Sequence, residues 1–187
     1  MIYRGHKGII FVESSNDNGQ FKYYNKEEIK NLIKDKNKLD NLISLWQELE
    51  DGSYELASRS RKNKELVDKR TIITEKNWNR SINSKEHKFI GLATLEINDS
   101  IIGMIQFSKL YNDLDAIFVS KVIITKDYRG RGYSKRLFKF ALDKAMEGFK
   151  SRYFSLILDY ANDKAHNLYK SIGFEDTSIT MHLFKKR

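Results

Sequence analysis

A glycine-rich stretch links an apolar segment to a helical pattern. Residues 116–124 are apolar over most of their length, and Arg129-Gly130-Arg131-Gly132-Tyr133-Ser134 follows them closely. Glycine lets the backbone turn sharply and approach a ligand, and the first amides of a helix have no partner within the helix. Amides in that position, at the positive end of the helix dipole, bind anions. The stretch therefore predicts a phosphate-binding loop.

Basic side chains are concentrated around this loop. Residues 126–152 contain nine Lys and Arg against three Asp and Glu, whereas the whole chain has 34 against 25 and a net charge of +9. Such a balance favours anionic partners, whether nucleic acid, acidic lipid or a phosphorylated cofactor. Charge alone does not distinguish among these three classes.

Residue identity excludes two common phosphate loops. A nucleotide P-loop requires Gly, four residues and then Gly-Lys-Ser/Thr, a register that Gly132-Tyr133-Ser134-Lys135 does not supply. A dinucleotide-binding loop requires a third glycine where Lys135 stands, and it would follow the first strand of a parallel unit.

Two motifs resemble those of the GNAT superfamily of N-acetyltransferases. Residues 129–134 resemble its signature Gln/Arg-x-x-Gly-x-Gly/Ala, with Ser134 in the place of Gly or Ala. Residues 162–174 are similar to its second motif, Asn-x-x-Ala-x-x-x-Tyr-x-x-x-Gly-Phe. The resemblance covers residues 39–187 and is strongest over 116–175.

The resemblance implies acetyl-CoA as the acyl donor and gives roles to individual residues. The loop would hold the pyrophosphate, and the main chain of the preceding strand would pair with the pantetheine arm where that strand splays from its parallel neighbour. Tyr169 would protonate the departing thiolate, or else would only pack on its helix face. Asn162 would contact the cofactor or cap its helix. The expected cofactor-binding residues are Val122, Ile123, Ile124, Arg129, Gly130, Arg131, Gly132, Tyr133, Ser134 and Asn162.

No general base is assigned from the sequence. Many family members carry a glutamate on the strand that here spans 118–122, and this chain has none there. Glu96, Asp113 and Asp115 lie on or beside adjoining strands. Each is expected to be a surface carboxylate, and the alternative is that one of them acts as the base through a water molecule. His166 lies in the second motif and is expected to be solvated. The four histidines show no paired metal-ligand spacing, so no metal is expected.

Hydrophobic periodicity indicates the elements that position these residues. Helices are expected where apolar residues recur every three or four positions, and strands where they run together or alternate. The expected helices are 39–49, 74–81, 133–149 and 162–172, and the expected strands are 89–97, 101–107, 116–124, 153–158 and 177–184. The predicted fold is α/β (α+β), with a mixed, mostly antiparallel central sheet of about six to seven strands, flanked by helices and splayed at the acyl-CoA site.

The chain is expected to consist of a short N-terminal extension and one larger domain. Residues 1–38 are an N-terminal extension, with a hairpin formed by 8–12 and 21–24 and a short helix within 26–38, packed on the domain. Residues 39–187 are the GNAT-like domain. The basic stretch 59–70 is expected to be a solvated loop or weak helix, with a docking surface for an acidic partner as the alternative.

Composition narrows the chemistry further. The chain has no cysteine, which excludes disulfides, thiolate metal sites and a cysteine nucleophile. No segment reaches the roughly 18–20 apolar residues needed to cross a bilayer, and no signal peptide is recognised. A cytoplasmic location and no membrane partner are expected.

The sequence as a whole predicts an acetyl-CoA-dependent N-acetyltransferase acting on a primary amine, of a small molecule or of a peptide or protein, by direct attack. The alternative is a non-catalytic basic module of the same fold that binds CoA, nucleic acid or an acidic protein. Pure nucleic-acid binding is disfavoured because aromatic residues are not interleaved with the basic runs. The acceptor, the acyl-chain preference and the oligomeric state are left open, a homodimer being one option.

Overall fold

The centre of the molecule is one six-stranded sheet whose strands lie in chain order. The computed structural model describes residues 12–14, 19–60, 70–85, 87–110, 116–149 and 152–178. The strands are β1 (Val12–Ser14), β2 (Gln20–Tyr24), β3 (His87–Ile97), β4 (Ser100–Leu110), β5 (Ala116–Ile124) and β6 (Tyr153–Ser155). Only β5 and β6 are parallel. The predicted mixed, mostly antiparallel sheet is confirmed, at the low end of the expected strand number, and the final strand expected at 177–184 lies almost wholly outside the described residues.

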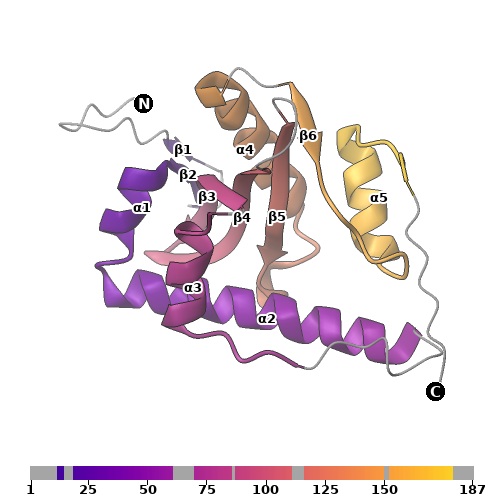
Figure 1. Cartoon of the computed structure of the whole chain (residues 1–187), viewed down its shortest axis with the longest axis horizontal. Coiled ribbons are helices and arrows are strands. Elements are labelled where there is room, and N and C mark those ends of the chain that lie inside the picture. Colours follow the sequence, from indigo (N-terminus) through magenta and orange to yellow (C-terminus); the bar gives the residue numbers. More distant parts are fainter. Residues whose placement is uncertain are drawn as a thin grey trace.

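Helices cover both faces of this sheet. They are α1 (Lys26–Leu32), α2 (Lys36–Ser60), α3 (Glu75–Ile82), α4 (Tyr133–Phe149) and α5 (Asp163–Ile172). α1, α2 and α3 pack on one face, whereas α4 packs on the other and α5 lies beside α4 (Figure 1). None of the helices in the described ranges is both long and apolar enough to span a bilayer.

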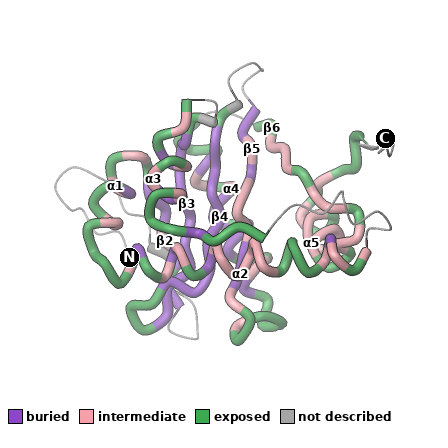
Figure 2. Tube along the Cα trace, turned by 60° about the horizontal axis from the view of Figure 1, so that its bottom comes forward, coloured by how far each residue is buried: buried purple, intermediate pink, exposed green. Residues whose placement is uncertain are grey.

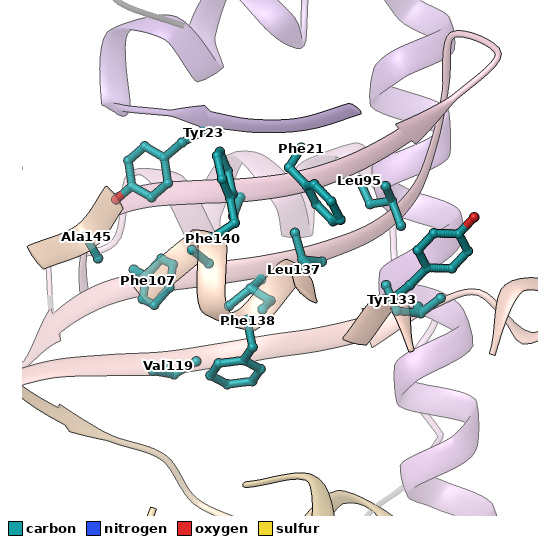
Figure 3. Packing of buried hydrophobic residues seen from close by; sticks show 14 of the residues in the cluster. Phe21, Tyr23, Leu95, Phe107, Val119, Tyr133, Leu137, Phe138, Phe140 and Ala145 are labelled. Carbon is teal, nitrogen blue, oxygen red and sulfur yellow. The ribbon is translucent and has the colours of Figure 1, made fainter. Parts of the chain in front are cut away.

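Two apolar clusters form the core, one on each face. Strand residues and α4 make up the first, which includes Phe21, Phe107, Val119, Leu137 and Phe138 (Figure 3). Strand residues and the first three helices make up the second, which includes Ile29, Leu42, Leu45, Trp78 and Met104. Figure 2 shows how the buried residues concentrate in the central strands, whereas α5 contains no buried residue.

The N-terminal helices differ from the prediction at their junction. The structure ends α1 at Leu32 and begins α2 at Lys36, three residues before the expected start at 39. The reason is local, because the carboxylate of Asp35 accepts hydrogen bonds from the amides of Asn37 and Lys38 and so caps α2. α2 also continues to Ser60, well beyond the apolar stripe that ends at residue 49.

Residues of the expected extension belong to the same sheet and core. β2 pairs antiparallel with β3 from Gln20↔Glu96 to Tyr24↔Leu92. Ile29 of α1 is completely buried in the second cluster. Part of the expected hairpin is present as β1 and β2, and residues 8–11 lie outside the described ranges. The division between 1–38 and 39–187 stays a prediction.

Candidate active site

A tight loop connects the end of β5 to the start of α4. The amide of Thr125 donates to the carbonyl of Ile102 on β4 over 2.8 Å, and a single 3₁₀ turn, η2 (Lys126–Tyr128), follows. Gly130 and Gly132 then have φ values of +77° and +76°. Side chains other than glycine rarely adopt this left-handed conformation, so the two glycines give the loop its shape.

Backbone amides along this loop are available to a ligand. Among the described residues, none accepts a hydrogen bond from the amides of Gly130, Arg131, Gly132, Ser134 or Lys135. The last two lie in the first turn of α4, where helix geometry leaves amides without partners, and the helix dipole adds positive potential there. The row of amides can therefore bind an anion such as a diphosphate.

Arg129 is held by protein groups rather than left free. Its Nε donates to the carbonyl of Ile124 over 2.7 Å, and its Nη2 lies 2.5 Å from Oε1 of Glu48 on α2. The carboxylate of Glu48 also accepts from the hydroxyl of Thr125 and the amide of Lys126. Arg129 thus ties the loop to α2 and uses two of its five N–H donors in doing so.

The other predicted loop side chains occupy different environments. Arg131 is exposed, donates to the carbonyl of Asp127 and lies over the ring of Tyr128, 5.3 Å from its centroid. Tyr133 is only 3% exposed and belongs to the core against α4, so its side chain faces away from solvent. Ser134 is half-buried.

Near the loop, β5 has no partner on one side among the described strands. β6 pairs with it only from Ala116↔Tyr153 to Phe118↔Ser155, and then the chain leaves the sheet. Val122, Ile123 and Ile124 therefore lie beyond the last β5–β6 pair, and Figure 1 shows the two strands separating toward this end of β5. This is the splayed geometry that the sequence predicted.

Tyr169 of α5 lies on the aromatic face of α4. Its ring centroid is 5.6 Å from that of Phe138 and 5.9 Å from that of Phe174. Burial raises the pKa of Tyr169 above the ordinary 10, and among the described residues the hydroxyl has no hydrogen-bond partner. Phe138 lies five residues into α4 from Tyr133, or about 7–8 Å along the axis, so the ring packs near the loop end of α4.

A family model described as the acetyltransferase (GNAT) family matches residues 44–174, which are most of the chain. The chain belongs to this acetyltransferase family. Membership confirms the resemblance seen in the two motifs and assigns the chain to an acyltransferase class.

Individual relatives agree with the GNAT assignment. A 64-residue segment is 33% identical to spermidine N(1)-acetyltransferase of Escherichia coli K12, and the match covers 34% of each chain. An aminoglycoside acetyltransferase from an uncultured soil metagenomic sample has a TM-score of 0.59 at 13% identity, covering 94% of this chain and 99% of that one. Aminoglycoside N-acetyltransferase AAC(6')-Iy in complex with CoA has a TM-score of 0.54 at 13% identity, covering 94% and 100%. The structural matches show the shared fold.

Asn162 of this GNAT chain caps its own helix. Its Oδ1 accepts from the amide of Ala165 over 3.1 Å. Of the two roles left open by the sequence, the cap is therefore present. The side-chain Nδ2 group and the second lone pair of Oδ1 remain to contact a cofactor.

The acidic candidates for a general base are placed elsewhere or lie outside the described residues. Glu96 is 3% exposed, so the expectation of a surface carboxylate was wrong, and it is bonded by Lys22, Lys38 and Tyr24. Asp113 and Asp115 are outside the described ranges. Within those ranges no group of three or more His, Asp or Glu side chains could hold a metal ion.

His166 is partly exposed, as expected, and is paired with a carboxylate. Its Nε2 lies 2.8 Å from Oδ1 of Asp176, and the side chain is 43% exposed. This contact joins α5 to the segment that follows it. His166, three residues before Tyr169, therefore belongs to a surface pair with Asp176.

A shallow pocket of about 520 Å³ lies along one face of α2. Three carboxylates line it, but each is already paired: Asp40 with Lys36, Glu48 with Arg129, and Asp51 with Arg70. The pocket therefore offers little net negative charge to a cationic substrate.

Sequence reasoning missed one half-buried charged residue near the loop, Lys121 of β5. Its Nζ lies 4.3 Å from the ring centroid of Trp46 on α2 and donates to the hydroxyl of Ser81 on α3 over 3.1 Å. Lysine is rarely buried without a carboxylate partner. The sequence offered one indication of this burial: Lys121 is the one charged residue in the otherwise mostly apolar segment 116–124.

Proposed function

We propose that this GNAT protein transfers the acetyl group of acetyl-CoA to a primary amine by direct attack of the amine on the thioester. The observation that carries the proposal is a row of loop amides that have no partner among the described residues, preceded by a strand segment that none of the described strands pairs on one side. Those are the two backbone features that a diphosphate joined to an extended arm requires.

The residues fit acetyl-CoA part by part. The diphosphate would be bound by the amides that have no partner among the described residues, those of 130–132 and 134–135, with Arg131 as an exposed cation beside it. The main chain of Val122–Ile124 would supply hydrogen bonds to the amide groups of the pantetheine arm. The side chains of Ile123 and Ile124 are buried, so only main-chain groups of these residues are offered to the cofactor.

Catalysis in this arrangement would come mainly from position and polarisation. Holding amine and thioester in contact removes most of the entropic barrier, and amides directed at the carbonyl stabilise the oxyanion that forms. Tyr169 is the proposed acid: as the C–S bond breaks, its hydroxyl donates a proton to the CoA sulfur. An ordinary phenol of pKa ~10 and a thiol of pKa ~8.5 differ by about 1.5 units, or roughly 2 kcal/mol, which is small against a catalysed barrier. Burial raises the pKa of Tyr169 and widens this difference in the protein without bound cofactor.

The acceptor we propose first is a small amine. Spermidine and aminoglycosides, which the relatives' names contain, are small molecules with several amino groups. A peptide or protein amine is the alternative acceptor. Both classes supply the same nucleophile, a neutral primary amine.

The proposal is tested by measuring the release of free CoA thiol from acetyl-CoA with a panel of amines. The panel contains spermidine, an aminoglycoside and a lysine-containing peptide. Tyr169→Phe retains the ring contacts with Phe138 and Phe174 but lacks the proton, so kcat should fall by about 100-fold with CoA affinity unchanged. Tyr54→Phe, which removes a partly exposed hydroxyl from α2, is the matched control and should retain full activity.

One further outcome would reject this function, and another would reject only the role of Tyr169. Turnover with no amine, together with salt-sensitive binding of DNA or RNA, would favour the non-catalytic basic module. Equal activity of Tyr169→Phe and Tyr54→Phe would leave acetyl transfer in place but remove Tyr169 from it.

A further inference from the structure

Lys121 lies at a β-bulge in the middle of the predicted cofactor-binding strand. Ser120 pairs with Gln106 and Ile123 pairs with Met104, so Lys121 and Val122 together stand opposite the single residue Ile105. Lys121 has a φ of +49°, which is uncommon for a residue with a side chain. Bulges and such backbone angles are frequent beside active sites, where they redirect a side chain.

The bulge decides which face of the sheet receives the amino group. Ile117 and Val119 point into the core against α4, and strict alternation would send residue 121 there as well. Beyond the bulge, the alternation of side chains between the two faces is shifted by one residue. Ile124 now lies on the α4 face, and Ile123 lies in the cluster against α2. Lys121 therefore points to the α2 and α3 face, directly before the strand segment at which the thioester would lie.

The surroundings of Lys121 are apolar or neutral on nearly all sides. α2 supplies the ring of Trp46, and α3 supplies the hydroxyl of Ser81, which is itself hydrogen-bonded to Gln106 of β4. Among the described residues the one charged group that acts on its pKa is Glu50 of α2, and no carboxylate of these residues is within ion-pair distance of it. Burial lowers the pKa of Lys121 to about 8, against a smaller opposing effect of Glu50.

We propose that Lys121 is the general base of the acetyl transfer, accepting the proton that the attacking amine loses. This inference rests on the proposed function. As the C–N bond forms, the lone pair of Nζ takes a proton from the attacking nitrogen. As the C–S bond breaks, Tyr169 gives its proton to the sulfur and later regains one from solvent, while Lys121 releases its own to solvent. The sum is one acetylated amine and one CoA thiol.

The environment of Lys121 makes a neutral amino group available at ordinary pH. With a pKa of about 8, roughly a quarter of the molecules carry neutral Lys121 at pH 7.5, whereas an ordinary lysine would be neutral in about one molecule in a thousand. A base is most useful when its pKa lies close to the working pH. No glutamate is needed on this strand for the role.

Two variants separate this role from others that a buried cation could have. Lys121→Met retains the length and apolar stem without the nitrogen, and Lys121→Arg retains a permanent positive charge that accepts no proton. Thiol release is measured from pH 6.5 to 9.5 with two amines of different pKa. Lys76→Met, an exposed change on α3, is the control.

For the wild type we expect kcat/KM to rise with pH through an inflection near 8 with both amines. Both Lys121 variants should lose that inflection and about 10²–10³-fold in kcat at pH 8, with an unchanged Kd for CoA. Activity of Lys121→Arg close to that of the wild type would overturn the proposal in favour of a charge that stabilises the oxyanion. An inflection retained in Lys121→Met would overturn it in favour of a structural role.

An NMR titration of the Lys121 side chain provides a readout independent of turnover. The resonance should titrate near pH 8 in the wild type and lower in Glu50→Gln, because the favourable charge is removed. Titration above pH 10 would overturn the proposal even in an active enzyme. Conversely, absence of acetyl transfer in the wild type with every amine would reject the proposed function itself, and the base with it.

Discussion

Glu48 of α2 and Arg129 of the β5–α4 loop form an ion pair with an Nη2–Oε1 distance of 2.5 Å. The same carboxylate also accepts hydrogen bonds from the hydroxyl of Thr125 and the amide of Lys126, so one side chain contacts the loop at three residues. Arg129 continues the connection to the carbonyl of Ile124 at the end of β5. A helix near the N-terminus thereby fixes the conformation of the proposed phosphate site.

Glu48→Ala should weaken CoA binding without unfolding the protein. The pair is partly exposed, with side chains 52% and 31% accessible, so its loss should raise the Kd for CoA by about three- to tenfold. Isothermal titration calorimetry measures this change directly. Glu55→Ala on the same helix removes an exposed partner of Arg59 and serves as the control. A Kd that stays within twofold in Glu48→Ala would show that the loop keeps its shape without α2.

Gly132→Ala should reduce both stability and cofactor affinity through backbone strain alone. A Cβ at this residue would meet no heavy atom within 4 Å, but the φ of +76° costs an L-residue about 1 kcal/mol or more. Gly148→Ala is a matched control, because its Cβ also meets nothing, its φ is ordinary, and alanine favours the helix interior by about 1 kcal/mol. Thermal unfolding should therefore shift in opposite directions for the two variants. Equal shifts would contradict this explanation.

Glu96→Gln should destabilise the protein at neutral pH and much less in acid. Burial alone would raise the pKa of Glu96, but hydrogen bonds from Lys22, Lys38 and Tyr24 outweigh it and hold the pKa below the ordinary 4.5. The stabilisation is therefore complete above pH 4.5 and is lost as the pH falls through the lower, folded-state pKa.

Urea unfolding of the wild type and Glu96→Gln at pH 7 and near pH 3 measures this effect. Removing one member of a buried charged cluster costs a few kcal/mol. The free energy of unfolding of Glu96→Gln is therefore expected to be lower than that of the wild type by about 2 kcal/mol or more at pH 7. This difference in unfolding free energy should become smaller as the pH is lowered. A difference that does not change with pH would mean that Glu96 stabilises the fold through the packing of its side chain rather than through its charge.

Local patterns in the sequence were sufficient for the elements that carry the loop. The helix at 133–149 and the strand at 116–124 were predicted to the residue, because an amphipathic stripe and an apolar run are signals within one segment. The expected strands 89–97 and 101–107 leave a short connection between them, where Asn98 and Asp99 have φ values of 49° and 61° that suit a tight hairpin turn.

What the sequence did not reveal depends on contacts between distant segments. The burial of Glu96 requires Lys22 and Lys38, which lie 74 and 58 residues away. The orientation of Lys121 depends on the pairing of β5 with β4, because only that register creates the bulge. The cap formed by Asn162 was one of two roles that its residue type allowed, and geometry was needed to show which of them is present.

The brief pairing of β6 with β5 has a thermodynamic consequence for the C-terminal part of the chain. Three residue pairs and the edge-to-face contact of Tyr169 with Phe138 are the contacts that attach this part most clearly to the rest. An extended ligand arm hydrogen-bonded along β5 would act as a substitute strand and bridge the two parts. Cofactor affinity and the local unfolding equilibrium of α5 would then be linked, so that a ligand which completes the sheet also secures the helix that carries the proposed acid.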